Sequence, residues 1–348
     1  RIAFIFDSKE DIQKIANDPW DSLSLLEKAE DPFRFLAACR EVSRFFTEGY
    51  GCLSSLPVQM DATSQGIQIW ATLLDNQDLM EASNVLAGLV MPRDIYQELA
   101  NTINDIARTS DNPNCTYFRK NPISRKLAKA ALIIIPYGGT VFAIRELVDS
   151  QDWDAPFKAR GWLSKELWEQ ARDVLDPIVK CQEKAAQAVR KQLREDPGTR
   201  TITWYPPSGL IVRQLYMKDK RIRIKNVLDQ TIHAYRIETD EVDVRKNAAA
   251  FSPNFIHSLD SSILCLGLIN SYNKYNVKDV MAIHDCVGVH AAHAPQVHKE
   301  MSSSFIEVLK DPSILRFFSF LISNTDSLLY TGGLLNREDT KLSYYLFS

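Results

Sequence analysis

Long apolar runs are missing from this sequence, and their absence excludes one class of protein at the outset. A helix that crosses a bilayer needs about 18–20 consecutive apolar residues, and the longest apolar stretch here covers only residues 130–136. We therefore expect no membrane span and no membrane partner. The sequence begins with Arg1 and shows no signal peptide, so we expect the true N-terminus to precede this residue.

Cysteine and histidine patterns typical of zinc sites are also missing. The six cysteines include no CxxC pair, and the six histidines include no HExxH motif. Structural and catalytic zinc sites use such paired spacings. The sequence therefore predicts the reduced thiols of a cytosolic protein and no zinc site.

The sequence has no excess of positive charge, since its formal net charge is −3. This disfavours a nucleic-acid partner, because phosphate binding needs positive potential. Basic residues nevertheless gather in two segments, residues 119–129 and 218–225. Either segment alone is most simply a solvated surface, so its interpretation depends on the residues around it.

The remaining composition is that of a soluble globular protein, with 45% hydrophobic and 24% charged residues. Hydrophobic periodicity and turn residues predict mostly helices and a few short strands, and therefore an α+β fold that is mainly α. The expected helices cover much of residues 1–50, then 66–74, 79–109, 123–135 and 164–195, the last being the longest helical region. The expected strands cover 58–61, 201–205, 210–217, 221–227, 231–237, 280–283 and 287–289.

Three local patterns carry the chemistry. Asp61 ends a predicted strand just before a helix, and Asp285 follows His284 at the tip of a predicted hairpin. Arg125 and Lys129 lie one turn apart on one face of a predicted helix. Each pattern alone is weak, because aspartates after strands are usually turn residues and exposed cations are usually solvated. In this order they predict a polymerase active site.

The chemistry of nucleotide addition explains why these residue types belong together. Two divalent ions about 3.5–4 Å apart can activate an attacking 3′-hydroxyl and stabilise the leaving oxygen, and Mg²⁺ prefers hard oxygen ligands. Asp61 and Asp285 would hold two Mg²⁺ ions, while Arg125 and Lys129 would clamp the triphosphate. Lys129 could also protonate the departing pyrophosphate. Tyr137 would lie where the templating base and the incoming sugar meet.

In these residues the chain resembles the catalytic half of the phage and mitochondrial single-subunit RNA polymerases, the family of the T-odd phage enzymes. Residues 61–68 resemble motif A of that family, residues 125–138 motif B, and residues 283–285 motif C. The likeness runs nearly end to end. It implies a right-hand fold with palm and fingers, an antiparallel palm sheet, magnesium dependence and de novo RNA synthesis on DNA.

The resemblance also implies roles and a division of the chain. It implies substrate binding for His284, together with Arg125, Lys129 and Tyr137, and template binding for Gly138, Phe142 and His257. The expected parts are a helical palm-insertion-like segment (1–50), palm with motif A (51–80), fingers with motif B and a specificity-hairpin-like ribbon (81–249), and palm with motif C and a C-terminal foot (250–348).

The expected partners are a DNA template, nascent RNA, nucleoside triphosphates and a second polymerase chain. Nothing in the sequence resembles the family's N-terminal domain or thumb, so either the chain begins inside a longer protein or the polymerase is split. Split enzymes of this kind are the RNA polymerases of Enquatrovirus-type podoviruses, and the chain resembles their C-terminal, catalytic subunit. We accordingly expect a phage protein in the host cytoplasm rather than a mitochondrial one.

Two alternatives stay open at this stage. Family A DNA polymerases share motif B and a His-Asp motif C, but they commonly carry glutamate where this chain has Gly66, and glutamate where it has Cys286. Both differences favour ribonucleotides. A polymerase-like DNA-binding protein without catalysis is disfavoured, because Asp61, Lys129, Tyr137 and Asp285 are all present. Pro136 stands where the family usually has a small residue, so the preceding helix is expected to end differently here.

Overall fold

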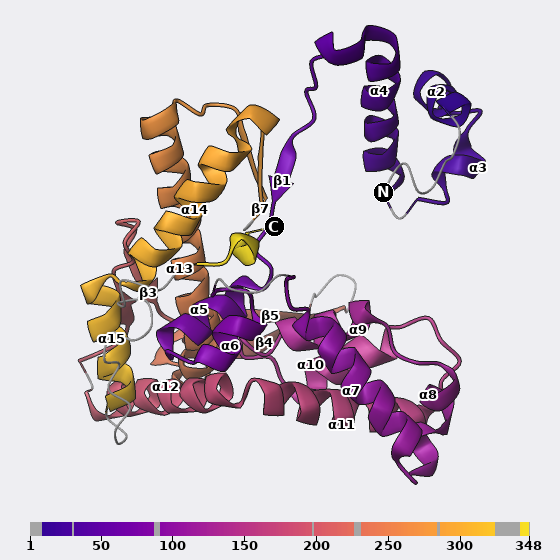
Figure 1. Ribbon diagram of the computed structural model, residues 1–348. Coiled ribbons are helices and arrows are strands. Elements are labelled where there is room, and N and C mark those ends of the chain that lie inside the picture. The colour runs from indigo at the N-terminus through magenta and orange to yellow at the C-terminus, as the bar shows by residue number, and fades with distance from the viewer. Residues whose placement is uncertain are drawn as a thin grey trace. The chain divides into compact units, whose positions relative to one another are not determined.

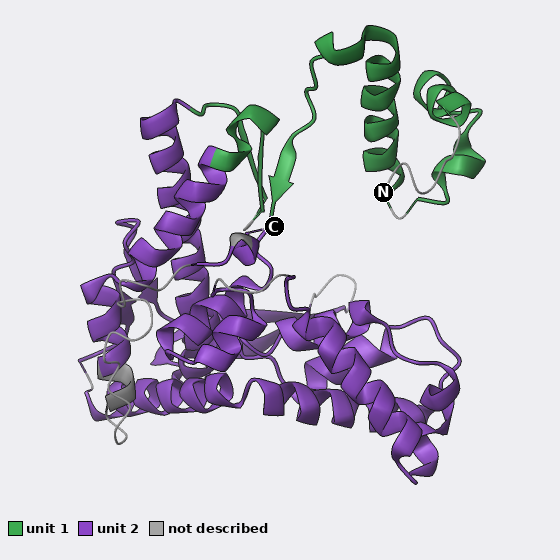
Figure 2. Ribbon diagram, viewed as in Figure 1, with its two compact units in different colours: residues 1–60, 277–295 green, residues 61–276, 296–348 purple. Residues whose placement is uncertain are grey.

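The computed structural model describes residues 9–29, 31–86, 91–196, 198–225, 231–283, 286–323 and 342–347 (Figure 1). The chain divides into two compact units (Figure 2). Unit 1 comprises residues 1–60 and 277–295, and unit 2 comprises residues 61–276 and 296–348. Both contain helices and short antiparallel sheets, which confirms the expected mainly helical fold.

Three helices form the N-terminal part of unit 1, namely α2 (Lys9–Asn17), α3 (Leu23–Leu26) and α4 (Pro32–Glu48), followed by a 3₁₀ turn, η1 (Gly49–Gly51). The Asp31 carboxylate caps α4 by accepting a hydrogen bond from the Arg34 amide at 3.1 Å. The helices share a small apolar core of Ile12, Ile15, Leu26, Phe35 and Cys39. The prediction of helices in this region is confirmed.

A three-stranded antiparallel sheet completes unit 1. Its order is β1 (Val58–Met60), β7 (Cys286–Val289) and β6 (Val280–Ile283), and a 3₁₀ turn, η3 (Ala291–His293), follows β7. Ile283 lies opposite Cys286 in the ladder. The predicted strands are therefore present, whereas the predicted tip residues His284 and Asp285 lie outside the described residues.

Unit 2 is dominated by helices, and the largest is α13 (Val244–Tyr275), with 32 residues. The expectation that residues 164–195 form the longest helical region is wrong, because that region divides at Leu175 just before Pro177, whose ring cannot continue a helix interior. Pro253 lies inside α13 and weakened the helical signal there. The other helices are α5 (Gln65–Leu73), α6 (Gln77–Ala82), α7 (Ile95–Thr109), η2 (Pro113–Cys115), α8 (Thr116–Lys120), α9 (Arg125–Ile133), α10 (Val141–Asp149), α11 (Phe157–Val174), α12 (Asp176–Glu195), α14 (Ala294–Leu309, which begins in unit 1), α15 (Pro312–Ser323) and η5 (Tyr344–Leu346).

Two antiparallel ribbons complete unit 2. One pairs β2 (Ile202–Trp204) with β3 (Val212–Gln214), and a longer one pairs β4 (Met217–Lys225) with β5 (Ile232–Val242). Both ribbons were predicted, although the second is longer than expected. No helix in the described ranges is both long enough and apolar enough to cross a bilayer. All six cysteines are free thiols, as expected.

An aromatic cluster forms much of the core of unit 2. Trp204 packs edge-on against Phe251 and Phe255 of α13, and Phe255 stacks on Phe318 of α15. Phe318 in turn meets Trp70 of α5. This continuous packing ties α5 to the long helix α13 and so supports the loop that precedes α5.

Candidate functional site

The loop that carries Asp61 is held by a segment from the far end of the chain. Ala62 forms an antiparallel bridge with Phe347. The Thr63 hydroxyl donates a 2.6 Å hydrogen bond to the carbonyl of Tyr345, 282 positions later. The Asp61 side chain itself is exposed. An exposed carboxylate on a braced loop is suited to binding a cation.

Helix α5 follows this loop, and all nine of its residues are buried. The Gln68 amide donates hydrogen bonds to the carbonyls of Ser83 at 2.9 Å and of Leu346 at 3.2 Å. The Trp70 indole N–H donates to the Pro136 carbonyl at 2.9 Å. These contacts link α5 to the terminal segment and to the turn after α9.

Tyr96 connects the Asp61 loop to the predicted triphosphate clamp. Its hydroxyl donates to the Thr63 carbonyl at 3.2 Å, and its ring faces the Arg125 guanidinium at 5.4 Å and the Lys129 ammonium at 5.5 Å. The ring is 2% exposed. Burial, with smaller contributions from the negative charges of Asp94 and Asp61, raises the pKa of Tyr96 to about 12, so the phenol is neutral at physiological pH.

The two cations of the predicted clamp share one helical face, as the sequence predicted, because both contact the same ring. They differ in their partners. Arg125 forms a 2.5 Å ion pair with Asp94. Partial burial alone would raise the pKa of the Asp94 carboxyl, but hydrogen bonds from Arg125 and the Gln97 amide bring it below its usual value. Lys129 is exposed and forms no ion pair within the described ranges, so its charge is available to a ligand.

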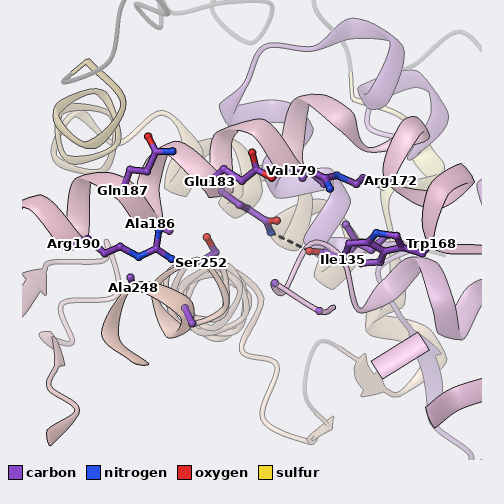
Figure 3. Close-up of a pocket in the computed structure, with 14 residues that line it drawn as sticks. Ile135, Trp168, Arg172, Val179, Glu183, Ala186, Gln187, Arg190, Ala248 and Ser252 are labelled. Carbon is purple, nitrogen blue, oxygen red and sulfur yellow. Dashed lines mark hydrogen bonds and ion pairs between the residues drawn. The ribbon is translucent and has the colours of Figure 1, made fainter. Parts of the chain in front are cut away.

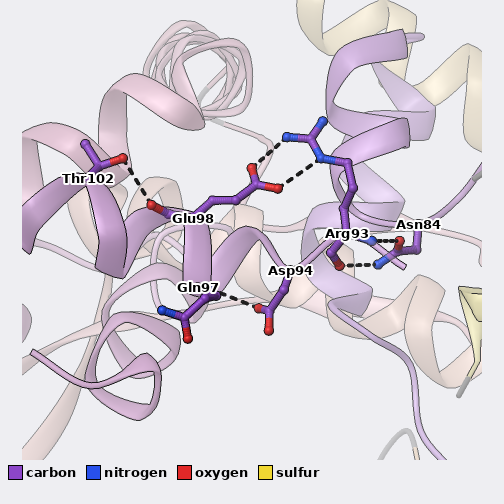
Figure 4. Close-up of polar contacts among 6 residues, drawn as sticks. All are labelled: Asn84, Arg93, Asp94, Gln97, Glu98 and Thr102. Carbon is purple, nitrogen blue, oxygen red and sulfur yellow. Dashed lines mark hydrogen bonds and ion pairs between the residues drawn. The ribbon is translucent and has the colours of Figure 1, made fainter. Parts of the chain in front are cut away.

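The start of α7, which carries Tyr96, is fixed by polar contacts (Figure 4). The buried Asn84 side chain donates to the Arg93 carbonyl at 2.9 Å and accepts from the Arg93 amide at 2.8 Å. The Arg93 side chain pairs with Glu98 at 2.6 Å, and the Asp94 carboxylate caps the helix by accepting from the Gln97 amide at 3.0 Å. This framework positions the Tyr96 ring beneath the two cations.

The turn after α9 carries Tyr137 and Gly138. The helix ends at Ile133, two residues before the predicted end. Pro136 lacks the N–H that a further helical turn requires, and Gly138 adopts a left-handed φ of 75° that glycine accommodates readily. The Gln182 amide of α12 donates to the carbonyls of Ile135 at 3.1 Å and of Pro136 at 2.7 Å. The turn is therefore held from two sides, by α5 and by α12.

Tyr137 lies against two residues that were predicted separately. Its ring stacks on the His257 imidazole, with centroids 4.6 Å apart and planes 15° apart. It also lies so close to Gly66 that a Cβ added there would meet the Tyr137 Cζ and Oη atoms at 2.9 Å. The structure thus brings together Gly66, Tyr137 and His257 from α5, the turn and α13.

The other predicted residues are placed as follows. Phe142 is 77% exposed in the first turn of α10, and Gly138 is exposed at the turn. His284 and Asp285 lie outside the described residues. Among the residues that are described, no group of three or more histidines, cysteines, aspartates and glutamates could hold a metal ion.

Comparison with known proteins shows the family of the chain. Residues 1–339 match the family described as DNA-dependent RNA polymerase. The chain belongs to this family. It is 30% identical over 339 residues to the chloroplastic DNA-directed RNA polymerase 3B of Nicotiana tabacum, covering 90% of this chain and 33% of that protein.

Mitochondrial members of the family are similar to a comparable degree. The chain is 25% identical to the mitochondrial DNA-directed RNA polymerase of Mus musculus, covering 92% of this chain and 27% of that protein. It is 28% identical to the mitochondrial DNA-directed RNA polymerase 1 of Arabidopsis thaliana, covering 90% and 33%. The chain thus spans about a third of the length of these curated relatives.

Sequence reasoning missed three contributors to the site of this family member. Tyr96 was noted only as part of a helix, although the Asp94 cap ahead of it was readable. Gln182 and Phe347 act through contacts with residues far away in the sequence. Neither carries a local signal that separates it from other amphipathic or C-terminal residues.

Proposed function

We propose that this chain is the catalytic part of a DNA-directed RNA polymerase that adds ribonucleotides to RNA on a DNA template. Membership of the polymerase family supports the reaction class. The observation that carries the proposal is the position of the Tyr137 ring, which packs against Gly66 and stacks on His257. Gly66 follows the Asp61 loop, which a backbone bridge to Phe347 holds in place.

The contact between Gly66 and Tyr137 supports ribonucleotides as substrates. A residue with a side chain at position 66 would overlap the ring in its present position, since even a Cβ would lie 2.9 Å from it. A glutamate there, which would exclude a ribose 2′-hydroxyl, is incompatible with this position of Tyr137. The chain therefore lacks, beside the Tyr137 ring, the carboxylate that would exclude the hydroxyl.

The residues present fit a magnesium requirement. Asp61 offers an exposed hard oxygen donor on a loop held by a backbone bridge, and Mg²⁺ needs only one or two protein carboxylates besides water and substrate phosphates. In the proposal Asp61 and Asp285 hold two Mg²⁺ ions. When bound, the ions would lower the cost of charge on the attacking and leaving oxygens.

The neighbouring side chains have separate proposed tasks. Lys129 would neutralise the triphosphate and donate a proton to the leaving pyrophosphate, and Arg125 would contact the triphosphate while it stays paired with Asp94. Tyr137 orients the sugar of the incoming nucleotide. His284 contributes to substrate binding, and Gly138, Phe142 and His257 contact the template.

The wider assignment follows the family. We assign residues 1–80 and 250–348 to the palm with its insertion and foot, and residues 81–249 to the fingers. We also propose that a second polymerase chain contributes positive surface, because the net charge of −3 is low for an enzyme that grips nucleic acid. The relatives are named for chloroplasts and mitochondria; for this chain the proposed location is the cytoplasm of a phage-infected host.

Nucleotide incorporation on single-stranded DNA with Mg²⁺ tests this function, using the chain alone and with any co-purifying protein. We expect ribonucleotides to be preferred over deoxyribonucleotides. Asp61→Asn and Asp285→Asn should each lower incorporation on the order of a thousandfold or more, and the matched loop variant Asp111→Asn should leave it unchanged. Preference for deoxyribonucleotides would indicate a DNA polymerase, and incorporation that survives both aspartate variants would refute the metal assignment.

A further inference from the structure

A cavity of about 310 Å³ lies behind the turn that carries Tyr137 (Figure 3). Its walls come from the turn itself, through Ile135, Gly138 and Gly139, and from α11, α12 and α13. Its volume is at the lower end of the range of small-molecule sites. None of the catalytic roles proposed above uses this space.

The apolar part of the cavity suits a flat ring. Ile135, Val179, Ala186 and Ala248 provide aliphatic surface, and Trp168 contributes an indole ring. Figure 3 shows Trp168 at one end of the cavity and Arg190 at the other. Aromatic side chains beside aliphatic walls are a common setting for stacked nucleobases.

The charged part of the cavity points to an anion. Arg172 is engaged already, because it pairs with Glu183 at 2.6 Å and lies over the Trp168 ring at 6.0 Å. Arg190 is half-buried, and it forms neither an ion pair nor a hydrogen bond within the described part of the chain. A guanidinium with five donors and no partner is well suited to a phosphate group.

A hydrogen-bond acceptor is available on the α13 wall. Pro253 has no N–H, so the carbonyl of Ala249, four residues earlier, cannot accept the usual helical hydrogen bond. Ala249 lines the cavity together with Ser252 and Gln187. The wall therefore offers an acceptor, a hydroxyl and an amide to the polar edge of a base.

From these features we propose that the cavity binds a nucleotide, with its base beside Trp168 and its phosphate on Arg190. The nucleotide could be part of the DNA template or a free nucleotide, since both present the same chemistry. The inference rests on the proposed function, which brings both species to this face of the protein. Gly138 contributes to the cavity and to the predicted template contact, so the two sites are continuous.

Occupation of the cavity would act on the turn. Gln182, one of the lining residues, holds the carbonyls of Ile135 and Pro136. A nucleotide packed against the same residues would restrain the turn and so reduce the motion of Tyr137. The cavity would thereby couple a bound nucleotide to the residue that orients the incoming sugar.

The test uses the fluorescence of 2-aminopurine, which is quenched by stacking. One arm uses single-stranded DNA with the probe at successive positions, and the other uses free 2-aminopurine riboside monophosphate. Arg190→Ala is compared with Arg194→Ala, which removes the same charge from an exposed position one turn further along α12. Trp168→Leu provides a second variant, and circular dichroism confirms that each variant is folded.

We expect quenching in one arm, an affinity about tenfold weaker for Arg190→Ala, and little change for Arg194→Ala. Quenching at one DNA position identifies a template nucleotide, and quenching only by the free monophosphate identifies a free one. The proposal is overturned if neither probe is quenched or if the two arginine variants behave alike. Ribonucleotide incorporation measured on the same samples separates the two hypotheses, because incorporation without quenching removes the cavity proposal and leaves the proposed function intact.

Discussion

The Asp61 loop and the β4–β5 ribbon are both predicted to meet nucleotides or nucleic acid, but they are built in opposite ways. Around the loop, α5 is wholly buried, and Tyr96, Thr63 and Phe347 are fixed by hydrogen bonds and packing. In the ribbon nearly every side chain is exposed. The first region is organised without a ligand, as the proposed catalysis requires, whereas the second presents exposed side chains on a two-stranded ladder.

The ribbon presents two chemically different faces. Side chains that lie directly opposite each other in an antiparallel ladder share a face, and the register pairs Arg221 with Arg236 and Ile222 with Tyr235. One face therefore carries four basic side chains, and the other carries four large apolar ones. The basic face carries Arg221, Arg223, Lys225 and Arg236 beside Asp219, Ile232, Ala234 and Glu238, and the apolar face carries Ile222, Ile224, Tyr235 and Ile237 beside Lys220 and His233.

Truncation of the Phe347 side chain should produce the largest loss of stability. Phe347 is 2% exposed and pairs with Ala62, next to Asp61. Phe347→Ala should lower the free energy of unfolding by about 3–5 kcal/mol and should reduce nucleotide incorporation, because the Asp61 loop loses its support. Denaturant unfolding measures the first effect. Phe33→Ala, at a position 85% exposed, is the control and should change stability by less than about 0.5 kcal/mol.

Alkaline pH should reveal the burial of Tyr96. Because its pKa is raised to about 12 in the folded protein, the unfolded chain loses this proton first, near pH 10. The stability that the protonated Tyr96 phenol adds to the folded state is therefore fully present below about pH 10 and is lost as the pH rises to about 12. The loss amounts to about 2–3 kcal/mol.

Tyr96→Phe isolates this contribution. At neutral pH the variant should be less stable by about 1 kcal/mol, since the Thr63 carbonyl loses its donor. Between pH 9 and 12 the wild type should lose more stability than the variant, so the difference between them should shrink and then reverse. Unfolding curves at several pH values measure this, and the fully exposed Tyr50→Phe should leave the pH dependence unchanged. Parallel pH curves for wild type and Tyr96→Phe would contradict the raised pKa.

Gly66→Ala should reduce stability less than Phe347→Ala does, and it should mainly affect the choice between ribonucleotides and deoxyribonucleotides. Glycine to alanine within a helix normally stabilises by about 0.5–1 kcal/mol, but here the new Cβ meets the Tyr137 ring at 2.9 Å. We expect a net loss of about 1 kcal/mol and weaker discrimination between ribonucleotides and deoxyribonucleotides. Gly51→Ala, which meets nothing within 4 Å, is the matched control. Unchanged discrimination would mean that the ring moves aside without consequence.

What the sequence predicted well was carried by local signals. The strand before Asp61, the hairpin strands around His284 and the long ribbon all follow from alternation and turn residues. The placement of Arg125 and Lys129 on one helical face follows from their spacing. His284 and Asp285 themselves stay predictions.

What the sequence could not predict depends on contacts between distant segments. Pro253 reads as a helix breaker, but the packing of α13 against α5 and α12 outweighs the loss of one hydrogen bond. The contact between Tyr137 and Gly66 connects positions 71 residues apart in the sequence. The bridge between Phe347 and the Asp61 loop connects positions that are still farther apart. Periodicity and capping signals describe single helices or strands, so they do not predict contacts between residues that are distant in the sequence.

The smallest effect on stability, and the sharpest contrast with the loop, is expected in the ribbon. Arg223→Ala removes an exposed charge and should change the free energy of unfolding by less than about 0.5 kcal/mol. If the basic face binds phosphates, the slope of log K against log salt for DNA binding should decrease by about 1. Lys218→Ala on the same strand is the control, because Lys218 already pairs with Glu241 at 2.8 Å.

A third ribbon variant tells the two faces apart. Ile237→Ser changes the apolar face, so a phosphate-binding ribbon should keep its salt slope in this variant while Arg223→Ala loses part of it. If the salt dependence of DNA binding changes in neither variant, the basic face does not bind DNA. A fall in stability for either variant would show that the ribbon is already packed against something in the free protein, and the contrast with the Asp61 loop would no longer hold.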